Sequence, residues 1–433
     1  MTLETWLASM GPEEMSFNRT ELDSKIRVVT ERIPEVRSVS LGVSIDTGSR
    51  DENENERGLT HFIEHLLFKG TPDMNAKQIA EAFDFMGADL NAATGREFTS
   101  IYSRVVDQHL PRAVEIIMDM AQRPLMDDGD INSERQVLLE EVAMHMDSPD
   151  ELVHDHLAQT LWGDHPLGHM VLGDARVVSE VSREKLLEFR SQRYIASRIV
   201  IAAAGSVDHD KLCDLISKNT GAMQAGGPTL RDNALPGPAT GKHIFFRETE
   251  QAHICIGSKG IPRKHPERFT LAVMDNILGG SMSSRLFQSI REEKGLAYSI
   301  YSYHGMFLGM GMVGVYCGTQ PGQAQKVIEL IEDELVLARE KGFTREELGR
   351  AKNHIEGSLL ISLEDSGNRM SRLSKAELAR DEHMTVDQLI ERVRKVTLDD
   401  LNRVFSDTWG STNASLAVVG PFEEDSLSLS GRI

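Results

Sequence analysis

The stretch His61-Phe62-Ile63-Glu64-His65 is the most informative segment of this chain. Its two imidazoles and its carboxylate are spaced so that all three lie on one face of an α-helix. Two neutral imidazoles four residues apart can hold one Zn²⁺ ion, and a carboxylate beside them can take a proton from an attacking water. The segment therefore predicts a helix that carries a hydrolytic zinc site.

The residues around this motif favour the helix. Apolar residues recur at helical spacing on both sides of the histidines, at Leu59, Phe62, Ile63, Leu66 and Leu67. Lys69 and Gly70 predict where the helix ends, because a cation in the last turn followed by glycine is typical of a helix C-terminus.

A catalytic zinc site needs a third protein ligand and leaves one position open. A second predicted helix, over residues 132–147, carries Glu134 and Glu141. These two are seven residues apart, so two turns bring them to nearly the same face, whereas Glu140 should point elsewhere. Spacing alone leaves both Glu134 and Glu141 open as the third ligand.

At this point the chain resembles the M16 (pitrilysin-type, inverzincin) zinc metallopeptidases. It is most similar to half-length members such as the mitochondrial processing peptidase β subunit and its bacterial homologues. The segment Gly58–Thr71 is similar to the zinc helix of the family, and His165–Gly168 to another family segment. The resemblance extends over nearly the whole chain. It implies one Zn²⁺ per chain, bound by His61, His65 and Glu141, with Glu134 as a supporting acid.

The resemblance also assigns residues outside the metal site. Residues 87–99 are similar to an edge strand of the family that binds substrate, which implies that Asn91 and Ala92 contact the peptide backbone. Arg291 and Tyr298, seven residues apart, match a pair that supports catalysis by donating hydrogen bonds to the substrate carbonyl. Without the resemblance, Arg291 would be interpreted as a solvated helix charge and Tyr298 as a strand aromatic.

An internal repeat predicts the fold. Similar segments begin at Ser182 and Thr397 and end at Gly205 and Gly420, an offset of 215 residues in both cases. We expect an α+β protein with two homologous domains, 1–230 and 231–433, each a mainly antiparallel β-sheet flanked by helices. The boundary falls in a segment rich in Gly and Pro. At the same offset of 215 residues, the zinc motif of residues 61–65 corresponds to residues 276–280, which lack metal ligands. We therefore expect the second domain to carry Arg291 and Tyr298 but no metal site.

Composition narrows the class of protein. A chain of 433 residues with 40% hydrophobic residues suits a two-domain globular protein. The formal net charge of −20 argues against nucleic-acid binding. The negative charge either keeps the protein in solution or lines a chamber that attracts basic peptides. Neither a targeting segment nor an apolar run of membrane-spanning length is recognisable, and cysteines are few. We expect a cytoplasmic protein without membrane partners.

These observations predict a zinc-dependent endopeptidase in which Glu64 is the general base. The resemblance implies that it cleaves peptides or unfolded, presequence-like segments inside a dimeric clamshell chamber. Arg291 and Tyr298 would then act at the zinc site of a partner chain, so a homodimer would contain every residue that the reaction needs. A heterodimer with an inactive partner is the alternative. The competing function is a non-catalytic or substrate-presenting scaffold subunit, and a third is a zinc hydrolase of non-peptide bonds.

Overall fold

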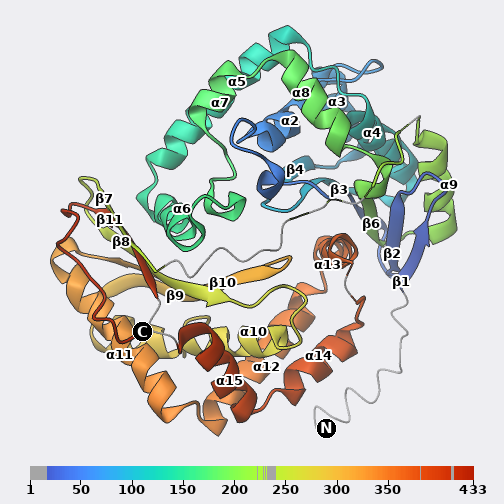
Figure 1. Ribbon diagram of the computed structural model, residues 1–433. Helices are drawn as coiled ribbons and strands as arrows, with labels where there is room; N and C mark the ends of the chain where they lie inside the picture. The colour runs from blue at the N-terminus through green and yellow to red at the C-terminus, as the bar shows by residue number, and fades with distance from the viewer. Residues whose placement is uncertain are drawn as a thin grey trace.

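The computed structural model describes residues 17–221, 223–227, 229, 231, 240–380, 382–410 and 414–433. Residue 230, where the sequence predicts the domain boundary, lies outside these residues, as do residues 232–239 of the predicted linker. The α+β class is confirmed: two separate β-sheets are each flanked by helices (Figure 1).

The first sheet has six strands in the order β1-β2-β6-β3-β5-β4. Only β2 and β6 run parallel; the other neighbours are antiparallel. Its strands are β1 (Phe17–Glu21), β2 (Arg27–Arg32), β3 (Ser38–Ile45), β4 (Leu90–Thr94), β5 (Thr99–Val106) and β6 (Ile199–Gly205).

The helices of the first half include the one predicted to carry zinc and the acidic helix predicted after it. They are α2 (Leu59–Leu67), α3 (Ala76–Met86), α4 (Leu110–Gln122), α5 (Asp128–Met146), α6 (Pro149–Trp162), α7 (Ala175–Glu180), α8 (Arg183–Arg193) and α9 (His209–Asn219). Short 3₁₀ turns lie between them: η1 (Ser49–Asp51), η2 (Asp107–His109), η3 (Pro166–Gly168) and η4 (Ala196–Arg198).

The second sheet has the order β7-β11-β8-β10-β9, with β7 and β11 parallel. Its strands are β7 (Lys242–Phe246), β8 (Ala252–Gly260), β9 (Ala297–Phe307), β10 (Met310–Thr319) and β11 (Ser415–Gly420). Its helical segments are α10 (Arg268–Leu278), the π-helical η5 (Phe287–Glu293), the 3₁₀ turn η6 (Pro321–Gln323), α11 (Ala324–Lys341), α12 (Arg345–Ser362), α13 (Ser366–Ala379), α14 (Val386–Lys395) and α15 (Leu398–Trp409).

The two halves repeat one topology, as the sequence offset predicts. The order β7-β11-β8-β10-β9 matches β2-β6-β3-β5-β4, including the single parallel pair. Gly205 ends β6 and Gly420 ends β11, 215 residues later. The helix α10 takes the place of α2 between the second and third strands of the repeat, and it begins well before residue 276, where the metal motif would map.

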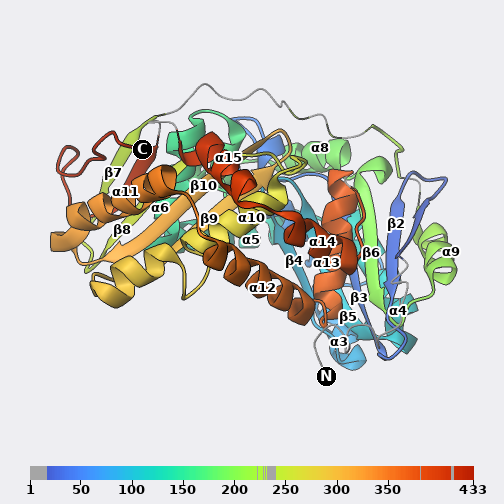
Figure 2. The same cartoon turned by 90° about the horizontal axis from the view of Figure 1, so that it is seen from below.

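The two halves exchange one helix each. The apolar face of α6 packs on the second sheet, where Val153, Leu157 and Leu161 join a cluster with Cys255, Tyr316 and Val419. Conversely, α13 packs on the first sheet, where Met370 and Leu373 join Val29, Val200 and Ala202. Figure 2 shows α13 alongside β6 and β3. Each sheet is therefore covered on one face by a helix from the other half, which buries apolar surface between the halves.

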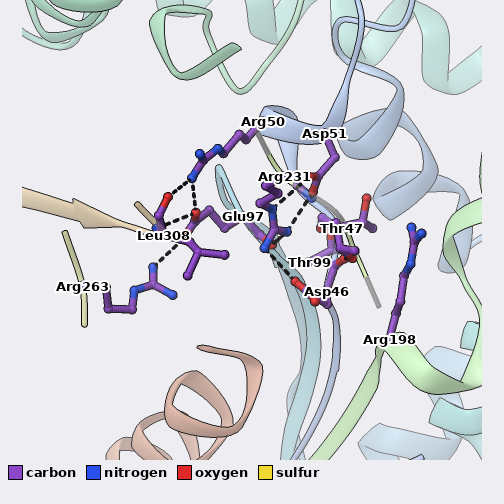
Figure 3. Close-up of polar contacts among 12 residues, drawn as sticks. Asp46, Thr47, Arg50, Asp51, Glu97, Thr99, Arg198, Arg231, Arg263 and Leu308 are labelled. Carbon is purple, nitrogen blue, oxygen red and sulfur yellow. Dashed lines mark hydrogen bonds and ion pairs between the residues drawn. The ribbon is translucent and has the colours of Figure 1, made fainter. Parts of the chain in front are cut away.

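A buried polar network joins the edge hairpins of the two sheets (Figure 3). Glu97, in the turn between β4 and β5, pairs with Arg50 at 2.6 Å and with Arg263 at 2.9 Å. Its carboxylate also accepts a hydrogen bond from the Leu308 backbone N–H, in the turn between β9 and β10, at 2.9 Å. Arg231, from the connecting segment, pairs with Asp46 and Asp51, both at 2.9 Å. Apart from Arg263, which is half-buried, these charged side chains are buried, and all of them are paired, as burial requires.

None of the helices in the described ranges is long and apolar enough to cross a membrane.

A second ionic cluster fixes α13 on the first sheet and generates a prediction. Glu377 is 3% exposed and accepts hydrogen bonds from Arg19 at 2.9 Å, Arg27 at 3.2 Å and His383 at 2.8 Å. Burial by itself would raise the pKa of Glu377, but the hydrogen bonds from His383 and Arg19 and the charges of Arg19 and Arg27 lower it to about 2.

Because this pKa lies below that of an unfolded glutamate, the carboxylate stabilises the fold above roughly pH 4.3, and this stabilisation is lost as the pH falls towards 2. We expect Glu377→Gln to lower the free energy of unfolding by about 3–5 kcal/mol at pH 7, since Arg27 stays buried without its counter-charge. In urea denaturation the difference from wild type should shrink below pH 4. The exposed Glu346→Gln is the control, and a difference independent of pH would contradict the assignment.

Candidate metal centre

The helix α2 separates an apolar face from a polar one. Its apolar residues are fully buried in the core of the first half: Leu59, Phe62, Ile63, Leu66 and Leu67. Of the four remaining residues, Thr60 is buried, and His61, Glu64 and His65 lie on the side towards α5 and β4. Lys69 and Gly70 follow directly after the helix, as predicted, and Gly70 has a φ of 137°.

The start of α2 is fixed by a carboxylate. Glu52 accepts hydrogen bonds from the backbone N–H groups of Gly58, at 2.9 Å, and Thr60, at 2.7 Å, which would otherwise have no partner. Gly58 has a φ of 99°, and its backbone touches Gly173, where an added Cβ would lie 2.2 Å from the Gly58 Cα. Only glycine fits both positions, so α2 begins at a defined place.

The structure brings His61, His65 and Glu141 together. The Glu141 Oε2 lies 3.5 Å from Nε2 of His65 and 3.9 Å from Nε2 of His61, and the ligand atoms of the three residues all lie within 4.8 Å of one another. The two imidazole rings are 4.8 Å apart and nearly perpendicular, at 81°. Glu140, the neighbour of Glu141, is exposed and faces elsewhere, as the helical spacing predicts.

These separations fit a shared cation better than a direct hydrogen bond. Hydrogen bonds between nitrogen and oxygen span roughly 2.7–3.2 Å. Ligand atoms about 2.0–2.2 Å from a tetrahedral zinc ion lie roughly 3.4 Å from one another, close to both distances to Glu141. Two imidazoles and one carboxylate are also a ligand set used by catalytic zinc sites. The residues present therefore suit Zn²⁺.

His61 is held in the form that binds metal. It is 8% exposed, and burial lowers its pKa to about 4, with a further contribution from the neighbouring His65. At neutral pH the ring therefore carries a free lone pair on one nitrogen. Its Nδ1 is buried and accepts or donates no hydrogen bond within the described residues.

Glu134 lies behind His65 rather than beside the three ligand atoms. Its Oε2 is 3.0 Å from Nδ1 of His65, and its Oε1 pairs with Lys69. With this bond Nδ1 carries the proton and Nε2 is left free to face Glu141, the arrangement in which a carboxylate orients a ligating histidine. The structure thus distinguishes the two glutamates that spacing left open: Glu141 faces both histidines, and Glu134 contacts one of them from behind.

Glu64 projects from the same face of α2 towards β4. Its carboxylate accepts a hydrogen bond from the Thr94 hydroxyl at the end of that strand. Burial raises the pKa of Glu64, and the nearby Glu141 adds to the rise, while the bond from Thr94 opposes it. A raised pKa brings a carboxylate closer to the value that suits proton transfer near neutral pH.

The predicted substrate strand is an edge strand. Within the described chain β4 pairs only with β5, where Asn91 lies opposite Tyr102 and Ala92 opposite Ile101. The Asn91 side chain is exposed, and its Oδ1 accepts the backbone N–H of Ala92 at 2.8 Å. The free edge therefore lies on the strand that also delivers Thr94 to Glu64.

Arg291 and Tyr298 lie next to one another but are not joined to the metal centre. The Arg291 guanidinium lies over the Tyr298 ring, 5.1 Å from its centroid, and over the Phe287 ring, at 4.5 Å. Tyr298 is 81% exposed. Among the described residues, neither makes a hydrogen bond or an ion pair with His61, His65, Glu64 or Glu141.

Three supporting residues were not predicted as parts of the site. Lys69 is predicted only as part of the C-terminus of the helix. Its spacing of four residues from His65 would place it on the same helix face as that histidine. Thr94 was noted as part of the edge-strand segment without a contact to Glu64. Glu52 caps α2 from a preceding loop, and no fixed spacing in the sequence signals such a contact.

Comparisons with known proteins identify the family of the chain. The model of the family described as insulinase (peptidase family M16) matches residues 27–175, and that of the peptidase M16 inactive domain matches residues 180–355. The chain is 40% identical to an uncharacterized zinc protease of Streptomyces coelicolor, over 95% of this chain and 91% of the relative. It is 38% identical to another from Bacillus subtilis, over 94% and 98% of the two chains.

Solved structures show the same fold. A peptidase M16 inactive domain from Pseudomonas fluorescens aligns with a TM-score of 0.88 and 19% identity, covering 95% of this chain and 99% of that one. A protease from Helicobacter pylori aligns with a TM-score of 0.86 and 20% identity, covering 94% and 100%. The two family models together span most of the chain, and relatives named zinc proteases match almost end to end: the chain belongs to peptidase family M16.

Proposed function

We propose that this chain is a zinc-dependent endopeptidase and that Glu64 is its general base. The observation that carries the proposal is the convergence of His61, His65 and Glu141, with the Glu64 carboxylate on the same face of α2. Relatives named zinc proteases support the same chemistry. A scaffold subunit would have no use for this set of side chains.

His61, His65 and Glu141 would hold one Zn²⁺ ion, which when bound lowers the pKa of water and polarises a peptide carbonyl. The Glu64 carboxylate takes a proton from the attacking water and later delivers it to the leaving amine. The Thr94 hydroxyl and backbone hold the Glu64 carboxylate in place for this exchange. Glu134 keeps the proton of His65 on Nδ1.

An extended peptide would bind along β4. Its backbone would add to the open edge of the sheet, a mode that gives affinity with little demand on sequence. A substrate carbonyl could replace Asn91 Oδ1 as the acceptor of the Ala92 N–H, since the two groups are chemically alike. The formal net charge of −20 favours basic peptides.

A second copy of the chain would complete the site. Arg291 and Tyr298 stack on one another at an exposed position, where both donors can reach another molecule. In a homodimeric chamber they would steady the negative charge that develops on the substrate carbonyl bound by the partner. A heterodimer with an inactive relative would use the same surface. All three cysteines are free, which suits a reducing compartment such as the cytoplasm.

Replacing the base should abolish hydrolysis without releasing metal. We expect Glu64→Gln to lower kcat for a fluorogenic peptide by about 10²–10⁴-fold, because proton transfer to a carboxylate is lost while the side-chain shape is kept. Zinc content, measured by atomic emission after dialysis, should equal that of wild type. Turnover within tenfold of wild type would remove Glu64 as the base.

Metal content separates the roles of Glu134 and Glu141 on α5. Glu141→Gln should leave the purified protein with little zinc, because a ligand is lost. Glu134→Gln should keep zinc with affinity weakened by about 10–100-fold, the usual effect of a residue that orients a ligand. The exposed neighbour Glu140→Gln is a matched control that should bind as wild type. Full occupancy in Glu141→Gln would show that another residue completes the site.

Mixing two inactive variants tests the shared site. An Arg291→Ala chain keeps an intact base, and a Glu64→Gln chain keeps an intact arginine, so a mixed dimer has one complete site of two. After random subunit exchange we expect roughly a quarter of wild-type activity. Exchange is verified by mass spectrometry of tagged chains. Exchange without recovered activity would place Arg291 outside the site of the partner.

A further inference from the structure

A cavity of about 400 Å³ lies between α5, α6 and the segment that leads from η3 to α7. These helices adjoin one another in the upper left of Figure 1. Its volume is in the range of small-molecule sites, roughly 300–1,000 Å³. The wall is largely apolar, with Val142, Met146, Leu152 and Met170.

One cation in this wall is unpaired. Arg57 has no ion pair and no side-chain hydrogen bond within the described chain, and its Nε is buried without a partner. The two acids of the wall are already engaged: Asp155 binds Arg96 and His145, and Asp174 accepts backbone N–H groups at the start of α7. A buried guanidinium nitrogen without an acceptor is unfavourable, so the position is suited to an anionic ligand.

A histidine adds a second group without a partner. His156 Nε2 is buried and makes no hydrogen bond within the described residues, while its ring stacks on His243 at 4.5 Å and on Phe245 at 4.9 Å. Burial lowers the pKa of His156 to about 4, and burial also lowers that of His169 in the same wall. Both rings are therefore neutral at pH 7, and Arg57 is the cation of the wall that has no carboxylate partner within the described residues.

We propose that this cavity binds a small monocarboxylate with an apolar body. The carboxylate would pair with the Arg57 guanidinium, which can donate two parallel hydrogen bonds to it, with His156 as a further donor. The apolar part would lie against Val142, Met146 and Met170. A single cation in a mainly apolar wall favours one negative charge over a phosphate, whose second charge would have no counterpart.

The cavity touches the supports of the metal centre but not its ligands. Arg57 immediately precedes Gly58, where α2 begins, and Val142 immediately follows Glu141 on α5. Gly173, another wall residue, packs against Gly58. A ligand here therefore contacts α5, which carries Glu141, and the segment that leads into α2. Its binding does not depend on the proposed peptidase activity and can be measured without it.

The test uses octanoate and its uncharged analogue octanamide. Titration calorimetry is performed on the full chain in EDTA, so that no metal can hold the carboxylate. We expect octanoate to bind, and octanamide to bind about tenfold or more weakly, because a hydrogen bond to a charged group is lost. Arg57→Gln should weaken octanoate by a similar factor. Arg176→Gln, which removes an exposed arginine on α7, should change it less than about twofold.

Two further probes distinguish the sources of the carboxylate. A short apolar peptide with a free C-terminus is compared with its C-terminal amide. Binding of the free peptide but not of octanoate identifies peptide C-termini as the ligand. Binding of octanoate but not of the free peptide identifies free acids. Arg57→Lys, which keeps the charge but not the planar pair of donors, should bind with intermediate affinity. Any one of three results would overturn the proposal. The first is equal binding of octanoate and octanamide, and the second is that neither octanoate nor the free peptide binds. The third is that Arg57→Gln, with an unchanged melting temperature, binds octanoate as the wild type does.

Discussion

The burial of one face of α2 is the constraint on which the metal centre depends. Five apolar side chains of α2 pack into the core of the first half. With these side chains buried, the helix can take only one rotation about its axis. His61, Glu64 and His65 must then share the opposite side. The Glu52 cap and the contact between Gly58 and Gly173 fix the helix along its axis as well. The imidazoles are thus positioned by packing and capping, before any ion contributes.

The same constraint explains which parts of the candidate site helical spacing could predict. Helical spacing alone predicts the polar face of α2. It also predicts that Glu134 and Glu141 share one face of α5, because both features depend only on local geometry. The choice between those glutamates needed the angle between α2 and α5, which no local pattern encodes. The repeat was predictable for a similar reason: each strand and helix keeps its own periodicity in both halves.

Contacts between distant segments could not be predicted. The amphipathic patterns of α6 and α13 indicate that each buries a face, but not that each buries it on the sheet of the other half. The network of Arg50, Glu97 and Leu308 depends on two hairpin turns meeting across that junction. The residue pattern around Arg291 predicts a helix there, but spacing rules do not predict that η5 is π-helical.

The exchange of α6 and α13 has a consequence for how the chain is made. The first sheet, whose last strand ends at Gly205, lacks its covering helix until residues 366–379 have left the ribosome. Until then Val29, Val200 and Ala202 present an apolar surface to solvent, the kind of surface that chaperones recognise. The first half therefore completes its packing only after α13 of the second half has been made.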